Sequence, residues 1–226
     1  MTDDYKGFGF ALIFVVMVAL GGFVAQGALA SPLTIEGGGA KTFFTGDQDG
    51  GKHKFVSSAT VECNNAVFSA ASSEGASVNE LTVKVTYSGC TAFGFASTDI
   101  KMNGCAFTYT TPTSVETGVV TWDTSGVHLT CPAGQKIEVT PTSFGFSVCT
   151  QSVAEQTPTG GHVIGRNIAA TSPMEGTLEA KLTGIHYTGT GGACGSGGTN
   201  AEYTGNSRLR CYSNETHTTQ VGCTFS

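Results

Sequence analysis

The sequence of 226 residues predicts an all-β fold: an antiparallel sandwich or open barrel, braced by disulfide bonds, after an N-terminal signal or anchor helix. Three observations predict this class. Apolar and polar side chains alternate with a period of two in most patterned segments, as in half-buried strands. Turn-forming Gly, Asn, Ser and Asp recur about every ten residues, which favours antiparallel strands. All eight cysteines follow residue 30, as is typical of an exported disulfide-bonded domain.

Residues 80–87 show the clearest strand pattern. Leu81, Val83, Val85 and Tyr87 fall on one face, and the polar residues between them fall on the other. Thr, Val, Phe and Tyr dominate this and similar runs, and such side chains fit a pleated sheet better than a helix. The same alternation predicts further strands at residues 105–110, 127–131, 136–140, 177–187 and 208–213.

Three connecting segments have turn or loop sequences. Residues 132–135 (PAGQ) contain a proline and a glycine, and are expected to join the strands on either side as a hairpin. The run at 189–198 (GTGGACGSGG) is expected to be a loop, pinned by Cys194. Phe-Gly-Phe occurs at 93–95 and again at 144–146, which we interpret as a recurring hairpin end.

The first 30 residues are expected to direct export. Residues 7–30 carry no charge, and 8–24 (FGFALIFVVMVALGGFV) are almost wholly apolar. The small residues Ala28 and Ala30 favour signal-peptidase cleavage before Ser31. The alternative is an uncleaved membrane anchor, because 24 uncharged residues are long enough to span a bilayer. Both interpretations export the rest of the chain.

The cysteines predict four disulfide bonds and no metal site. Zinc sites usually contain closely spaced ligand pairs such as C-x-x-C, and the sequence has none. Eight cysteines allow 105 pairings, so the connectivity stays open. The spacing nevertheless favours closing the two loops of nearly thirty residues and the C-terminal hairpin, which leaves one pair to join the two halves of the chain. These pairs are Cys63 with Cys90, Cys105 with Cys131, Cys211 with Cys223, and Cys149 with Cys194.

The mature chain divides at a Pro/Gly cluster. We expect a β domain at 31–155, a candidate linker at 156–165, and a C-terminal β segment at 166–226. Five cysteines precede the cluster and three follow it, so at least one disulfide must cross if all eight are oxidised. We therefore favour one continuous domain, or two parts strapped together by a disulfide bond.

Short motifs resemble a group of exported actinobacterial proteins of unknown function. The similar residues are 87–95 (YSGCTAFGF), 102–105 (MNGC) and 131–134 (CPAG), within roughly residues 55 to 150. Later pieces at 184–187, 192–194 and 203–205 are also similar to that group. The resemblance implies secretion and a cysteine-bearing β fold, and it supplies no catalytic residues.

Composition excludes several functional classes. The net charge of −6 and the absence of a basic cluster argue against a nucleic-acid partner. No G-x-S-x-G motif is present, so no serine nucleophile of the α/β-hydrolase type is expected. Residues 47–51 (DQDGG) open like a calcium loop but lack its later ligands, which favours a solvated turn. We expect neither a cofactor nor a metal.

Aromatic residues of two segments are candidates for a binding surface. Phe93 and Phe95 follow Cys90 in a glycine-flanked segment, and Trp122, the only tryptophan, ends the strand at 119–121. Rings exposed on a rigid sheet can stack on sugars or on partner side chains, and buried rings fill a β core. Both interpretations stay open, with core filling the commoner role of such rings.

The leading functional hypothesis is a secreted or cell-surface, non-enzymatic β protein that presents a binding or structural surface, in adhesion, envelope structure or ligand capture. Its partner would be a glycan or a protein surface, with membrane contact only through an uncleaved N-terminal segment. One alternative is a secreted hydrolase, although Glu62, Asp99, Asp123 and Glu138 are too scattered to nominate an acid/base pair. The other is a self-assembling surface-layer or fibre subunit.

Overall fold

The computed structural model describes residues 33–36 and 41–226, and the leader expected at residues 1–30 lies outside them. The expected all-β, antiparallel, disulfide-braced class is confirmed. The strands are β1 (Leu33–Ile35), β2 (Thr42–Gln48), β3 (His53–Val56), β4 (Thr60–Ser72), β5 (Ser77–Val78), β6 (Leu81–Ala92), β7 (Ala96–Lys101), β8 (Ala106–Tyr109), β9 (Ser114–Glu116), β10 (Val119–Asp123), β11 (Val127–Thr130), β12 (Ile137–Ser143), β13 (Phe146–Ser147), β14 (Thr150–Val153), β15 (Gly160–Ile168), β16 (Glu175–Thr190), β17 (Gly197–Tyr212), β18 (Gln220–Val221) and β19 (Cys223–Phe225). Two single-turn 3-10 helices, η1 (Thr124–Gly126) and η2 (Gly192–Cys194), complete the described elements.

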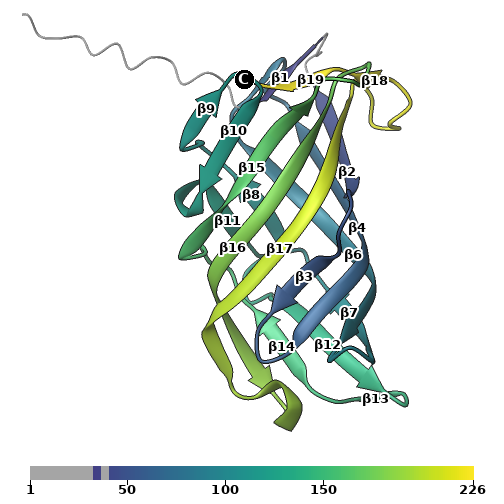
Figure 1. Cartoon of the computed structure of the whole chain (residues 1–226), viewed down its shortest axis with the longest axis vertical. Helices are drawn as coiled ribbons and strands as arrows, with labels where there is room; N and C mark the ends of the chain where they lie inside the picture. The colour runs from purple at the N-terminus through teal and green to yellow at the C-terminus, as the bar shows by residue number, and fades with distance from the viewer. Residues whose placement is uncertain (1–32, 37–40) are drawn as a thin grey trace, which may run out of the picture.

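The main sheet closes on itself. The strand pairings run β2–β4–β6–β7–β12–β14–β16–β17, and β17 pairs again with β2. Figure 1 shows long strands running obliquely along the molecule, with β13 at one end and β1, β18 and β19 at the other. At that second end, β1 pairs with β19 and β5 in a small separate sheet.

Alternation along the strands produces an apolar interior. In β6, Val83 and Val85 are buried, and Thr82, Lys84 and Thr86 between them are exposed. The face expected from residues 80–87 is therefore the inner face of the closed sheet. The other predicted strands also form, within β8, β11, β12, β16 and β17.

The turn at 132–135 forms, but it does not join a hairpin. The amide of Gln135 donates to the carbonyl of Pro132 at 2.9 Å, and Gly134 has a φ of 76°. β11, before the turn, pairs with β8, and β12, after it, pairs with β7 and β14. The hairpin prediction was wrong because a tight turn fixes only local chain direction, and the disulfide between Cys105 and Cys131 holds this end of β11 near β8.

The candidate linker at 156–165 is also corrected. β15 begins at Gly160 and pairs with both β10 and β16. Just before it, Gln156 exchanges backbone hydrogen bonds of 2.9 and 3.0 Å with Leu129. Strands from both sides of the expected boundary alternate in the closed sheet, for example β2 beside β17 and β14 beside β16. The Pro/Gly cluster is therefore a turn that leads into β15, which is held in the sheet by pairing with β10 and β16.

All eight cysteines are paired, and the pairs are those that their spacing favoured. Cys63 and Cys90 face each other in register across β4 and β6, and Cys105 is joined to Cys131. Two further bonds, Cys149–Cys194 and Cys211–Cys223, complete the set. The first of these two joins β14's entry to the β16–β17 connection, so it is the bond that crosses between the two halves of the sequence.

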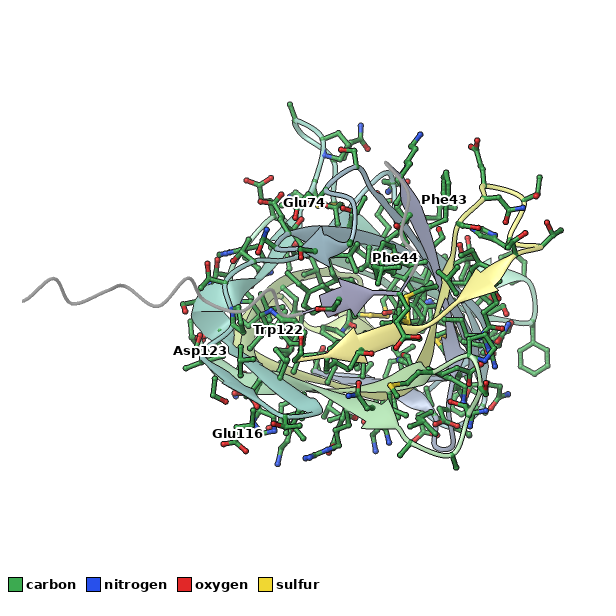
Figure 2. All side chains as sticks on the ribbon, turned by 90° about the horizontal axis from the view of Figure 1, so that it is seen from above. Phe43, Phe44, Glu74, Glu116, Trp122 and Asp123 are labelled. Atoms are coloured by element: carbon green, nitrogen blue, oxygen red, sulfur yellow. A yellow bond between two sulfur atoms is a disulfide. The ribbon has the colours of Figure 1, made fainter. Side chains whose placement is uncertain are left out.

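Trp122 belongs to the core. It is 5% exposed, its ring centroid lies 5.7 Å from that of Tyr109 and 6.2 Å from that of Phe225, and its Nε1 donates to the carbonyl of Thr110 at 2.9 Å. Figure 2 shows Trp122 inside the ring of strands when the molecule is seen from above. The interpretation of Trp122 as part of an exposed binding surface is therefore corrected: its indole fills the interior and its only polar atom is satisfied there.

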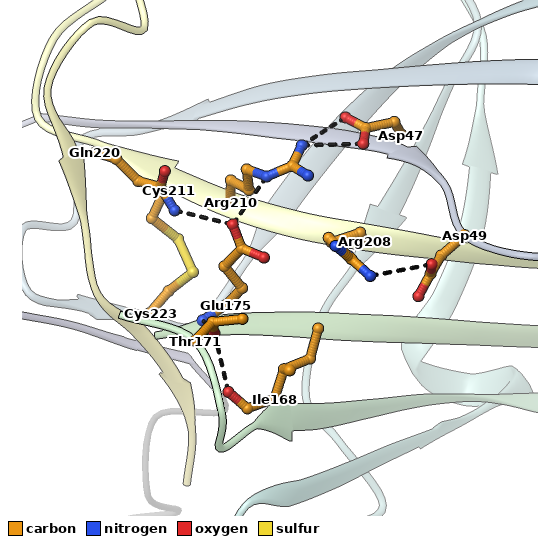
Figure 3. A network of polar contacts seen from close by, with 10 residues as sticks. All are labelled: Asp47, Asp49, Ile168, Thr171, Glu175, Arg208, Arg210, Cys211, Gln220 and Cys223. Atoms are coloured by element: carbon orange, nitrogen blue, oxygen red, sulfur yellow. Dashed lines mark hydrogen bonds and ion pairs between the residues drawn. A yellow bond between two sulfur atoms is a disulfide. The ribbon is translucent and has the colours of Figure 1, made fainter. Parts of the chain in front are cut away.

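Hydrogen bonds and ion pairs between side chains join β17 to β2, β16 and β18 near the C-terminus (Figure 3). Arg210 of β17 donates from Nη1 to both carboxylate oxygens of Asp47 on β2, at 2.8 and 2.9 Å, and from Nε to Glu175 of β16 at 2.9 Å. Gln220 of β18 donates to the same Glu175 oxygen at 3.1 Å. One guanidinium thus ties β17 to its neighbours on both sides, beside the Cys211–Cys223 bond.

Candidate functional site: an aromatic tip

The two Phe-Gly-Phe motifs lie side by side at one end of the closed sheet. The first forms the turn between β6 and β7, and the second the turn between β12 and β13. β7 and β12 are antiparallel neighbours, so the start of β7 lies next to the end of β12. We call Phe93, Phe95, Phe144 and Phe146 the aromatic tip. Its place is the end of the molecule marked by β13 in Figure 1.

The two turns share an unusual backbone. Phe93 and Gly94 have φ angles of 54° and 79°, and Phe144 and Gly145 have 51° and 82°. Two consecutive positive φ angles are the signature of a type I′ turn, whose first central position favours Asn, Asp or Gly. A bulky residue there is strained, at a cost on the order of 1 kcal/mol. Both turns therefore place a phenylalanine where local conformation disfavours one.

The tip exposes its rings to solvent. Phe144 is 100% exposed, Phe146 78% and Phe95 74%, whereas Phe93 is half-buried. The rings of Phe93 and Phe95 lie 6.5 Å apart between centroids. Exposure of three large apolar side chains at one place is more informative than scattered apolar residues, because such clusters mark interaction sites.

Rigid structure supports the tip. In the first turn, the amide of Phe95 donates to the carbonyl of Ala92 at 3.1 Å. Beyond the second turn, the amide of Val148 donates to the carbonyl of Pro141 at 2.9 Å, and the next residue, Cys149, is held by its disulfide to Cys194. The rings are thus carried on a scaffold that is ordered before any partner arrives, which lowers the entropic cost of binding.

The outcome for the predicted surface residues is mixed. Phe95 is exposed as a binding residue must be, Phe93 is partly covered, and Trp122 lies in the core. The structure adds Phe144 and Phe146, which the sequence reasoning did not nominate. The repeated Phe-Gly-Phe motif was the signal that could have found them, but their proximity depends on the pairing of β7 with β12.

Inside the closed sheet lies an apolar cavity of about 80 Å³, and the buried side chain of His53 is part of its lining. Nε2 of His53 donates to the carbonyl of Asn206 at 3.1 Å, so its Nδ1 is the acceptor for the Tyr203 hydroxyl at 2.7 Å. The Tyr87 hydroxyl in turn donates to the Tyr203 oxygen at 3.0 Å. The three side chains thus satisfy one another's hydrogen-bonding groups inside the protein. The other residues that line the cavity are mostly apolar and include Val61, Val139 and Leu182.

Burial sets the protonation of this network. It lowers the pKa of His53, because desolvation disfavours the imidazolium more than the hydrogen bond to Asn206 favours it. Burial also raises the pKa of Tyr87 and of Tyr203, and raises that of nearby Tyr109 to about 12. All four groups are therefore neutral near pH 7, which suits a structural role in an apolar interior.

Gln156 lines this cavity and also an open groove of about 550 Å³. The Gln156 side chain binds the backbone of His186: its Nε2 donates to the carbonyl at 2.8 Å, and its Oε1 accepts from the amide at 2.7 Å. The side-chain amide thus takes the place of a strand partner where β16 is irregular.

The other chemistry-bearing candidates are engaged elsewhere. Asp47 is bound to Arg210, and Asp49 accepts from Arg208 at 3.3 Å, so both carboxylates of residues 47–51 have guanidinium partners. The acidic residues weighed for a hydrolase line neither the cavity nor the groove. Glu62 pairs with Lys52 and Lys54, Asp99 with Lys101, Asp123 accepts from the amide of Ser125, and Glu138 is exposed on β12.

Two further classes of site are absent from residues 33–36 and 41–226. No cluster of three or more His, Cys, Asp or Glu side chains there could hold a metal ion. Within the same residues, no helix has the length and apolar character needed to cross a membrane.

No protein-family model, curated protein or solved structure matches the chain. The site must therefore be interpreted from its own chemistry.

Proposed function

We propose that this chain is a secreted or cell-surface, non-enzymatic protein that presents the aromatic tip as a binding surface, as an adhesion or envelope protein does. The observation that carries the proposal is the full exposure of Phe144 on a strained turn, together with the exposure of Phe95 and Phe146 in the same pair of neighbouring turns. Folding alone favours neither the exposure nor the backbone conformation, so both are accounted for by contact with a partner.

The four disulfides support the location. Disulfide bonds persist in oxidising surroundings, and a disulfide-rich all-β fold is consistent with an extracellular protein. The resemblance of residues 87–95 and 131–134 to exported actinobacterial proteins also supports the proposed location outside the cell. If it is right, protein recovered from its natural compartment has an intact mass lower than the fully reduced chain by eight hydrogen atoms.

Adsorption to an apolar surface that has no binding pocket tests whether the tip is the contact surface. We expect disulfide-intact protein to bind octyl-coated beads, and the variant F95S/F144S/F146S to bind at least tenfold more weakly, because each exposed ring contributes apolar contact area. The matched control is Val67→Ser, since Val67 is an exposed apolar residue (47%) on β4 outside the tip. Equal adsorption of the wild type and the triple variant would show that the tip is not the contact surface.

A further inference from the structure

On the basis of the proposed function, we infer that the partner of the aromatic tip is the interfacial region of a lipid bilayer, into which Phe95, Phe144 and Phe146 insert. Three features of the tip favour this class of partner. These are its convex shape, its lack of charge, and the way in which its backbone hydrogen bonds are satisfied.

The tip is convex. Its exposed rings belong to two adjacent turns. These turns lie at the end of the molecule that β13, only two residues long, marks in Figure 1. A protein partner would need a matching concave pocket for each ring, whereas a fluid bilayer requires no complementary shape. Phenylalanine has no polar side-chain atom, and it is among the residues that enter the boundary between headgroups and acyl chains.

The segments that form the tip carry no charge. Residues 91–98 (TAFGFAST) and 140–148 (TPTSFGFSV) contain no Asp, Glu, Lys or Arg, and their polar side chains are all hydroxyls of Ser and Thr. Charged groups are costly to bring to a bilayer, and hydroxyls are tolerated at its polar boundary. Glycan sites, by contrast, use amide and charged side chains to bind sugar hydroxyls, and these segments offer none.

Backbone hydrogen bonds also close the two turns. The amide of Phe95 is bonded to Ala92, that of Val148 is bonded to Pro141, and Ser143 pairs with Phe146 across the second turn. An unsatisfied amide or carbonyl is costly in an apolar medium, so a short closed turn can enter where an open loop cannot. The rings can therefore insert without carrying many unpaired backbone groups with them.

The experiment uses Phe146→Trp as a depth reporter in the disulfide-intact protein. Position 146 has no positive φ angle and lies in a strand, so a tryptophan fits its backbone. Phosphatidylcholine vesicles are added, with and without bromine atoms on the acyl chains. We expect a blue shift of the emission on binding, and quenching by the brominated lipid. Trp122 is the internal control, since it is buried in the core and its emission should change in neither case.

Vesicle sedimentation of the unlabelled protein gives the energetics. We expect about a tenfold weaker partition for each of Phe95→Ser, Phe144→Ser and Phe146→Ser, and no change for Val67→Ser. Because the tip is uncharged, replacing a third of the lipid by phosphatidylglycerol or raising the salt concentration should not strengthen binding. Circular dichroism of each variant checks that the fold is intact.

The outcomes separate the two proposals. Tip-dependent vesicle binding, with quenching of the reporter emission in the Phe146→Trp variant, supports the bilayer as partner. Tip-dependent adsorption to octyl beads without vesicle binding would overturn the bilayer and leave the binding surface intact. Vesicle binding that persists in F95S/F144S/F146S would also overturn the inference, and absence of tip-dependent binding to both surfaces would overturn both proposals.

Discussion

Thr142 of β12 lies directly opposite Ser97 of β7, and its Oγ1 donates to the Ser97 carbonyl at 3.0 Å. This register brings together two turns that are about fifty residues apart in the chain. A shift of the pairing by two residues would separate their rings along the strand direction by nearly 7 Å. The aromatic tip is thus a product of strand register as much as of sequence.

Replacing Phe144 by Asn should stabilise the protein and weaken its binding. Asn tolerates positive φ, so we expect the free energy of unfolding to rise by about 0.5–1 kcal/mol. The apolar ring is lost at the same time, so adsorption to octyl beads should fall. Urea denaturation and bead adsorption measure the two effects.

Phe146→Asn is the matched control for this trade. Phe146 is nearly as exposed as Phe144 but has no positive φ angle. Asn at position 146 should therefore weaken adsorption without raising stability. A stability gain of the same size at both positions would show that strain at Phe144 is not the cause.

Removing the Cys149–Cys194 bond should cost more stability than removing Cys211–Cys223. The sequence separations are 45 and 12 residues, and the chain-entropy model gives about 4 and about 3 kcal/mol respectively. Double Cys→Ser variants of each pair, compared by urea denaturation, measure the difference. The opposite order would mean that the entropy of the unfolded chain does not dominate.

The protein should lose stability as the pH falls below the pKa of an ordinary histidine side chain. Because burial lowers the pKa of His53 in the folded state, the unfolded chain binds a proton that the folded chain does not. The free energy of unfolding should therefore fall from about pH 6.5 downwards, by at most about 1.4 kcal/mol per pH unit from this group. His53→Gln should reduce the slope below about pH 6.5.

His186→Gln is the control for that titration, since His186 is exposed on β16. Its replacement should leave the slope unchanged in urea denaturation measured at the same pH values. A slope that is equally steep in the wild type and in His53→Gln would exclude His53 as its source.

Gln156→Ala should loosen the backbone of β16 at His186. The variant leaves the amide and carbonyl of His186 without their side-chain partner, at a cost of about 0.5–1.5 kcal/mol because water can reach these groups. Hydrogen exchange of the His186 amide should accelerate. Gln156→Glu is the comparison, because a carboxylate still accepts from this amide but cannot donate to the carbonyl. Unchanged exchange in Gln156→Ala would show that the side chain does not protect His186.

Local pattern was enough to predict much of this structure from the sequence. Alternation at residues 80–87 gave the inner face of β6 because a strand places every second side chain on the same side. Cysteine spacing favoured the four observed pairs, which join consecutive cysteines along the chain and close loops of 12 to 45 residues. Phe95 was recognised as a surface candidate because glycine-flanked aromatic residues belong to turns.

Long-range pairing was needed for the rest. The turn at 132–135 and the cluster at 157–161 looked like a hairpin and a linker, since chain direction is local but the choice of strand partner is not. Trp122 turned inward because β10 packs it against Phe225 from the far end of the chain. Phe144 joined Phe95 because β12 lies against β7, a relationship that depends on contacts over the whole closed sheet.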